Sequence, residues 1–202
     1  MTIATALTDV DRRALLDVAA DVISDALTHR GSRVPTPNDF APPLTQPGAS
    51  FVTLERGEQL LGCIGSLMPV EPLVVDVARH ALAAAFADPR LPPVTRDDFE
   101  QMSIKISVLS AHEPVPATTF RELIAAVRPD VDGLVVEAGR RRATLLPSVW
   151  RHVTDVDEFV TVLWQKAGLE PEAWPSNITV SRYTAVEFGD PGPRSLVKAA
   201  RQ

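Results

Sequence analysis

Two pairs of short β-prone runs, each joined by a glycine-containing turn, constrain the fold of this chain more than any other feature. "SFVTLE" and "QLLGCIGSL" are separated by "RGE", and "GLVVEAGRRRATLLP" holds two further β runs around a glycine and basic turn. Connections this short join antiparallel strands, because neighbouring parallel strands need a crossover of a dozen or more residues. The alternating run "IKISVLS" and the later run "VSRYTAVEF" predict two more strands.

Four helices are predicted around these strands, each from a local signal. The first has apolar residues at helical spacing, with Thr8 and Asp11 placed as a capping box. The second is an alanine-rich run, and the last carries a capping box at its start and a glycine at its stop. The predicted helices cover Asp11–Leu27, Leu73–Ala87, "FRELIAAV" and Asp155–Gly168. Hairpins with inserted helices indicate the α+β class, with an antiparallel or mixed sheet covered by helices.

The chain is expected to form one domain over residues 1–190, with or without a smaller lobe. Its 45% hydrophobic content is enough for a sizeable core. Gly31 is expected to end the first helix, and the proline-rich segment "VPTPNDFAPPLTQPG" is interpreted as an extended loop. The tail over 191–202 has little apolar periodicity, so we expect it to be mobile or loosely attached.

Charge and composition narrow the classes of function. The formal net charge of -6 argues against a broad nucleic-acid surface, because such surfaces neutralise phosphates with Lys and Arg. The N-terminal "MTIATALTDVDRR" lacks the pattern of a signal peptide, and the apolar run "ALAAAFA" is too short to cross a bilayer. A single cysteine cannot form an intramolecular disulfide. The cytoplasm is therefore the expected compartment, with no membrane partner.

Six blocks occur in the order found in one known family. They are "LLGCIGSL", "AAFADPRLPPVTRDDF", "IKISVLS", "GRRRATLLPSVW", "KAGL" and "RYT". In these blocks the chain resembles the AMMECR domain family, whose bacterial members are called AmmeMemoRadiSam system protein A. The resemblance implies an α+β fold with a larger and a smaller subdomain, a groove near the glycine and cysteine motif, and association with Memo-type and radical S-adenosylmethionine proteins. It implies no established reaction.

One residue departs from the family motif, which usually reads Leu-Arg-Gly-Cys-Ile-Gly. This chain has Leu61 where the arginine is expected. In a regular strand, residues two apart share a face, so position 61 would lie beside Cys63. An arginine there could stabilise a thiolate or hold an anion, whereas leucine can do neither, because apolar surroundings disfavour a thiolate.

Cys63 has two interpretations. As a nucleophile it would use Gly62 and Gly65 to let a ligand or another backbone segment approach closely, and it would need a base or cation nearby. His112 is the best-placed histidine by inference, because it follows a strand that could pair beside the motif. As a structural residue Cys63 would fill space among Leu61 and other apolar neighbours, as free cysteines commonly do.

Three arginines are candidates for holding a substrate. Arg90 follows a helix stop in the "DPR" block, where a rigid loop could aim its guanidinium at a carboxylate or phosphate. Arg142 begins the family-like "RATLLP" block, and Arg182 lies in the last predicted strand, where it could face the groove. The alternative for each is an exposed or half-buried surface role.

Three hypotheses of function remain open. The first is a cytoplasmic enzyme, or the accessory component of one, that binds a small anionic or modified substrate beside the GCIG motif. The second is a binding or scaffolding module with no covalent step, which Leu61 favours. The third is RNA binding through the turn Arg140–Arg142. We expect no metal and no cofactor, since neither paired histidine spacing nor a phosphate-binding glycine loop is present.

Overall fold

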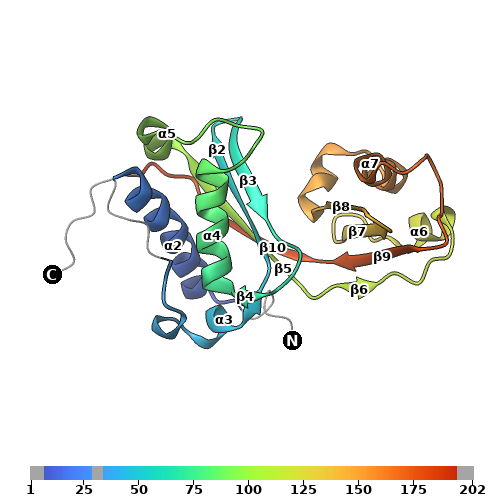
Figure 1. Cartoon of the computed structure of the whole chain (residues 1–202), viewed down its shortest axis with the longest axis horizontal. Helices are drawn as coiled ribbons and strands as arrows, with labels where there is room; N and C mark the ends of the chain where they lie inside the picture. Colours follow the sequence, from blue (N-terminus) through green and yellow to red (C-terminus); the bar gives the residue numbers. More distant parts are fainter. Residues whose placement is uncertain (1–6, 29–33, 195–202) are drawn as a thin grey trace. The chain divides into compact units, whose positions relative to one another are not determined.

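The computed structural model describes residues 7–28 and 34–194, and these form two compact units. The first unit contains the described residues up to Leu109 together with those from Val186 onward, and the second unit is Ser110–Ala185 (Figure 1). Each unit has its own apolar core and its own four-stranded sheet. The predicted α+β class with antiparallel sheets is confirmed, although the strands divide between two sheets.

The sheet of the first unit has the strand order β10-β5-β2-β3. Its strands are β2 (Ser50–Arg56), β3 (Gln59–Gly65), β5 (Ser103–Leu109) and β10 (Ala185–Asp190). The predicted first hairpin is present, because β2 and β3 pair antiparallel around a turn in which Gly57 has a φ of +60°. β5 pairs antiparallel with the other edge of β2.

Helices α2 (Asp9–Leu27) and α4 (Leu73–Phe86) contribute many of the buried residues of this unit's core. α4 packs against α2 and on strands β2 and β3 (Figure 1). The predicted capping box of α2 is present: the Thr8 hydroxyl accepts from the Asp11 amide at 3.2 Å, and the Thr8 amide donates to the Asp11 carboxylate at 2.9 Å. The predicted stop at Gly31 lies outside the described residues. None of the described helices has the length and apolar character that crossing a bilayer requires.

The proline-rich segment is not the extended loop that the sequence predicted. It forms η1 (Pro37–Asp39), the single-turn helix α3 (Pro42–Thr45) and β1 (Pro47–Gly48), which pairs with β4 (Glu71–Pro72). Proline is compatible with the first turn of a helix, where its missing N–H would have no partner. A further helix that we did not predict, α5 (Arg96–Gln101), starts at a capping box made by Thr95 and Asp98.

The second unit has a sheet of order β6-β9-β7-β8. Its elements are β6 (Glu113–Pro114), α6 (Phe120–Ala126), β7 (Gly133–Ala138), β8 (Arg141–Leu145), η2 (Pro147–His152), α7 (Val156–Ala167) and β9 (Ile178–Tyr183). β7 and β8 form the predicted second hairpin. In α7 the Asp155 carboxylate accepts from the Glu158 amide at 2.9 Å, and Gly168 ends the helix with a φ of +67°.

The run "VSRYTAVEF" is two strands in two sheets, not the single strand predicted. β9 belongs to the second unit and β10 to the first, with Thr184 between them. The ladder stops because both backbone groups of Thr184 bond to Ser110: the Ser110 amide donates to the Thr184 carbonyl at 2.8 Å, and the Thr184 amide donates to the Ser110 hydroxyl at 2.9 Å.

Part of the predicted tail is tied to the first unit. The Arg194 amide donates to the Glu100 carbonyl at 3.1 Å, and its guanidinium donates to the carbonyls of Met102 and Asp190. The Arg194 side chain is only 7% exposed. The remainder of the predicted tail, residues 195–202, lies outside the described residues.

Candidate functional site

Strand β3 carries the glycine and cysteine motif and gives its residues alternate faces of the sheet. Gly62 lies opposite Leu54, and Leu54 is fully buried under α4. Cys63 lies opposite Thr53, on the other face. The cysteine is half-buried, and the Thr53 hydroxyl donates to its Sγ at 3.3 Å. Cys63 is therefore neither sealed in the core nor fully exposed.

The two glycines permit close approach by other parts of the same chain. A Cβ on Gly62 would lie 1.9 Å from the carbonyl oxygen of Ala84 in α4. A Cβ on Gly65 would lie 2.3 Å from the Phe51 ring and 2.4 Å from the Ser50 carbonyl oxygen. All three distances are far below van der Waals contact, so these positions need glycine for packing. The sequence suggested that these glycines let either a ligand or another backbone segment approach closely. The structure shows the close approach of another backbone segment.

Arg90 lies beside the motif, but its guanidinium is hydrogen-bonded to the carboxylate of Asp88 in the same chain. Its Nε donates to Asp88 Oδ1 at 2.9 Å and its Nη2 to Asp88 Oδ2 at 2.6 Å. Nη2 also donates to the Cys63 carbonyl at 3.0 Å, while the Cys63 amide donates to Asp88 Oδ2 at 3.0 Å. We call this arrangement of Asp88, Arg90 and the Cys63 backbone the arginine clamp. It holds both backbone polar groups of Cys63, the amide and the carbonyl.

The clamp is an ionised pair with one member buried. The Asp88 side chain is 2% exposed and that of Arg90 is 60% exposed. Hydrogen bonds from the Arg90 guanidinium, and then from the Cys63 amide, hold the pKa of Asp88 well below its usual range. The same contact with Asp88 raises the pKa of Arg90. The charges therefore offset each other, and Arg90 presents less net positive charge than an unpaired arginine would.

Leu61 does not lie beside Cys63 as it would in a regular strand. The pairing of β2 with β3 shifts at this point, since Leu54 lies opposite Gly62 and Glu55 opposite Leu60. Leu61 is thus the extra residue of a β-bulge, which breaks the simple alternation of faces. It is 8% exposed and belongs to the apolar core of the first unit. The assumption of regular alternation behind our interpretation of Leu61 was wrong.

His112 belongs to the second unit, where its ring packs on an aromatic neighbour. Its centroid lies 5.3 Å from that of Tyr183, and its Nε2 is buried without a hydrogen-bond partner among the described residues. Burial, and to a lesser extent the positive charge of Arg142, lowers the pKa of His112. Both effects favour the neutral form of the ring. The role of His112 as a base for Cys63 stays a prediction.

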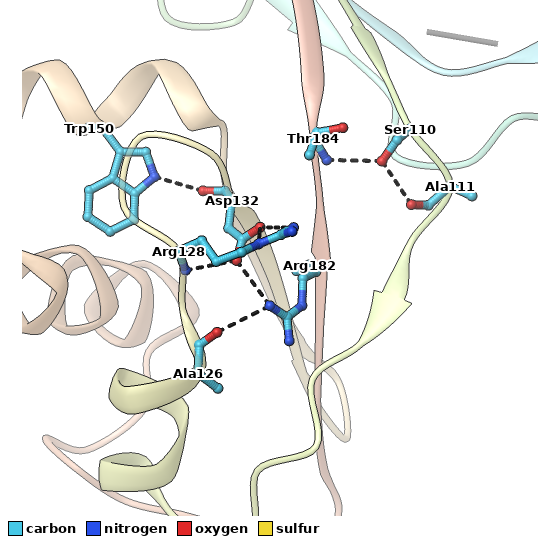
Figure 2. Close-up of polar contacts among 8 residues, drawn as sticks. All are labelled: Ser110, Ala111, Ala126, Arg128, Asp132, Trp150, Arg182 and Thr184. Carbon is cyan, nitrogen blue, oxygen red and sulfur yellow. Dashed lines mark hydrogen bonds and ion pairs between the residues drawn. The ribbon is translucent and has the colours of Figure 1, made fainter. Parts of the chain in front are cut away.

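Arg142 and Arg182 are also in the second unit, and each has a partner there. Arg142 Nε lies 3.0 Å from a carboxylate oxygen of Glu137, the residue opposite it on β7. Figure 2 shows Arg182 turned toward Asp132, a fully buried carboxylate that Arg128 also contacts. Arg182 Nη1 donates to the Ala126 carbonyl at 3.1 Å and lies 3.4 Å from Asp132 Oδ2. These contacts give Arg182 a structural role in its unit.

The structure thus brings Gly62, Cys63, Gly65 and Arg90 together in the first unit, and His112 lies near Arg142 in the second. Sequence reasoning missed Asp88 and Thr53. Asp88 had a signal in "DPR", because an aspartate two residues before an arginine can pair with it across a turn. Thr53 had none, because its place opposite Cys63 depends on the hairpin register.

Comparisons with known proteins extend over both units. A family model described as AMMECR1 matches residues 16–188. A protein of Methanothermobacter thermautotrophicus is 36% identical over 185 residues, which cover 89% of this chain and 94% of that protein. Protein PF1979 of Pyrococcus furiosus is 35% identical over 177 residues, 83% of each chain. The crystal structure of uncharacterized protein PH0010 from Pyrococcus horikoshii matches with a TM-score of 0.80 and 31% identity, covering 89% of this chain and 91% of that one.

Proposed function

Because this chain belongs to the AMMECR1 family, we propose that it is a cytoplasmic enzyme, or an accessory component of one, that uses the thiol of Cys63 on a small anionic or modified substrate. The arginine clamp is the observation that carries this proposal. It holds the backbone amide and carbonyl of Cys63 while the side chain stays half-buried on the sheet face away from α4. Reactive groups need a rigidly held main chain and access from solvent.

The hydroxyl of Thr53 supports the same proposal. It donates to Cys63 Sγ at 3.3 Å, which fixes the direction in which the sulfur points. The exposed part of Arg90 would orient an anionic group near the thiol. Arg142 and His112 remain proposed contributors from the second unit, as substrate ligand and base respectively.

Alkylation of the single cysteine tests the proposal. We expect iodoacetamide to alkylate Cys63 in the folded protein at neutral pH, because the side chain is half-buried and not sealed in the core. Thr53→Val removes the donor with little change of shape and should slow alkylation roughly threefold to tenfold, the effect of one hydrogen bond. Thr45→Val is the matched control, since the Thr45 hydroxyl bonds to the Pro42 carbonyl elsewhere in this unit. A thiol that reacts only after unfolding would contradict the proposal.

A binding or scaffolding module without a covalent step is the second candidate. The pairing of Arg90 with Asp88 favours it, because a guanidinium already neutralised by a buried carboxylate binds a further anion less strongly. In either case we propose Memo-type and radical S-adenosylmethionine proteins as partners. Co-purification of the three proteins from one organism tests this, and independent elution of the purified proteins at micromolar concentration would contradict it.

A further inference from the structure

A polar hollow separate from Cys63 lies in the first unit, where β3 ends and α4 begins. We call it the β3–α4 hollow; its volume is about 280 Å³. Ser66, Asp76 and His80 line its polar side, and Met68 and Val70 contribute apolar surface. Ser66 directly follows Gly65, so the hollow adjoins the glycine and cysteine motif along the chain.

Asp76 organises the polar side. Its side chain is 7% exposed and meets three donors: Ser50 Oγ at 2.6 Å, Ser66 Oγ at 3.3 Å and His80 Nδ1 at 3.2 Å. A buried carboxylate with this many donors is well satisfied and holds its neighbours in place. Asp76 and His80 are four residues apart on α4, which puts both on one face of the helix.

The contact with Asp76 determines which nitrogen of His80 is left for a ligand. A carboxylate only accepts hydrogen bonds, so Nδ1 carries the hydrogen and Nε2 of the neutral ring is an acceptor. Nε2 makes no hydrogen bond to any of the residues that the structure describes. The carboxylate on Nδ1 also fixes the orientation of the ring.

The remaining walls determine the kind of ligand. Met68 is 53% exposed and Val70 is 77% exposed, which is unusual for large apolar side chains. Arg79 also lines the hollow, but its Nη1 pairs with a carboxylate oxygen of Glu71 at 2.8 Å, so the two charges offset each other. The hollow therefore combines one acceptor nitrogen with apolar surface. Its charged groups are the paired Arg79 and Glu71 and the carboxylate of Asp76, which already accepts from three donors.

We propose that the β3–α4 hollow binds a small uncharged molecule with a hydroxyl group on an apolar body. The hydroxyl donates to His80 Nε2, and the apolar body lies against Met68 and Val70. An anion would meet the carboxylates of Glu71 and Asp76, and a cation would meet Arg79. This site goes beyond the proposed function, because it uses neither Cys63 nor the arginine clamp.

Phenol and anisole are the probes that test the site, because they share a ring and differ in the hydroxyl. The imidazole Cε1–H resonance of His80 is followed by NMR and assigned by its loss in His80→Gln. We expect a saturable shift with phenol, and binding of anisole roughly threefold to tenfold weaker, as for the loss of one hydrogen bond. His152→Gln, which alters an exposed histidine of the second unit, should leave the phenol response of His80 unchanged.

Asp76→Asn tests whether Asp76 positions the ring of His80, because asparagine has nearly the same size as aspartate. It keeps the shape of the side chain but weakens the hold on His80 Nδ1, so we expect weaker phenol binding with anisole binding unchanged. Each variant is first compared with wild type by urea unfolding, to show that it is folded. A His80 resonance that does not move with phenol, or that moves equally with both probes, would overturn the proposal.

Discussion

Arg90 holds both carboxylate oxygens of Asp88 and, with the same Nη2 atom, the carbonyl oxygen of Cys63. Two residues that are almost adjacent in sequence thereby reach across to a strand 25 residues or more away. The loop after α4 is bound to the edge of the sheet through these contacts. The motif and the "DPR" block are therefore one structural feature, and substitutions in either should affect the other.

Replacement of Arg90 by glutamine should destabilise the first unit. The change leaves the Asp88 carboxylate, 2% exposed, without its charged partner, and such a loss costs about 1–3 kcal/mol. Urea unfolding monitored by circular dichroism measures the free energy of unfolding. Arg13→Gln is the control, since Arg13 is 64% exposed and pairs at the surface with Asp17 and Asp190, where each pair contributes about 0.5 kcal/mol. Equal effects of the two substitutions would count against a structural role of the clamp.

Acid should lower the free energy of unfolding, and protonation of Asp88 should account for part of this loss. Because the fold lowers the pKa of Asp88, the folded state binds its proton less readily than the unfolded chain does. The resulting stabilisation is fully present above the unfolded carboxyl pKa of about 4 and is lost as the pH falls below it toward the folded value. Asp88→Asn should therefore show a smaller loss of stability than wild type between neutral pH and pH ~3. Parallel pH profiles for the two proteins would refute this assignment.

An alanine at position 62 should be poorly tolerated. Its Cβ would lie 1.9 Å from the Ala84 carbonyl oxygen, a backbone atom of α4 that can move only with the helix. Overpacking of this kind costs about 1–3 kcal/mol or more. Leu60→Ala on the same strand is the comparison, because Leu60 is 37% exposed and its truncation opens no core cavity. A Gly62→Ala variant as stable as Leu60→Ala would mean that β3 and α4 can separate at little cost.

Leu61→Arg should lower stability without activating the thiol. Leu61 is 8% exposed at a bulge, so the arginine would bring a charge toward the apolar core. We expect a loss of about 2 kcal/mol or more and an unchanged rate of Cys63 alkylation in the folded protein. Leu61→Met is the conservative control. Faster alkylation together with wild-type stability would show that the guanidinium reaches the face on which Cys63 lies.

The sequence predicted those elements whose signals are local. Both hairpins, the start of α2 and both ends of α7 follow from turn glycines and capping residues within a few positions of each other. The helix α5 had such a signal in Thr95 and Asp98, but its six residues leave little periodicity to detect. The division between β9 and β10 had none, because only the distant Ser110 interrupts the ladder at Thr184.

The candidate site was less predictable than the fold, because its contacts join residues that are far apart in the chain. The motif and Arg90 were identified through the family resemblance. Asp88, the carboxylate that pairs with Arg90, was not. The bulge at Leu61 could not be foreseen, since it depends on how β3 aligns with β2. Asp76 and His80 were separated by four positions on a predicted helix, and this spacing was the overlooked signal of their pairing.

Two hydrogen bonds join Ser110 and Thr184, and Figure 2 shows the one from the Thr184 amide to the Ser110 hydroxyl. The polypeptide departs from the first sheet after β5 and re-enters it at β10, and these two strands are neighbours. Residues 110–185 are thus an insertion in the connection between these two neighbouring strands. We expect that a short linker in place of this insertion would still let β5 and β10 pair. The insertion could then be lengthened, exchanged or removed without changing the path of the rest of the chain.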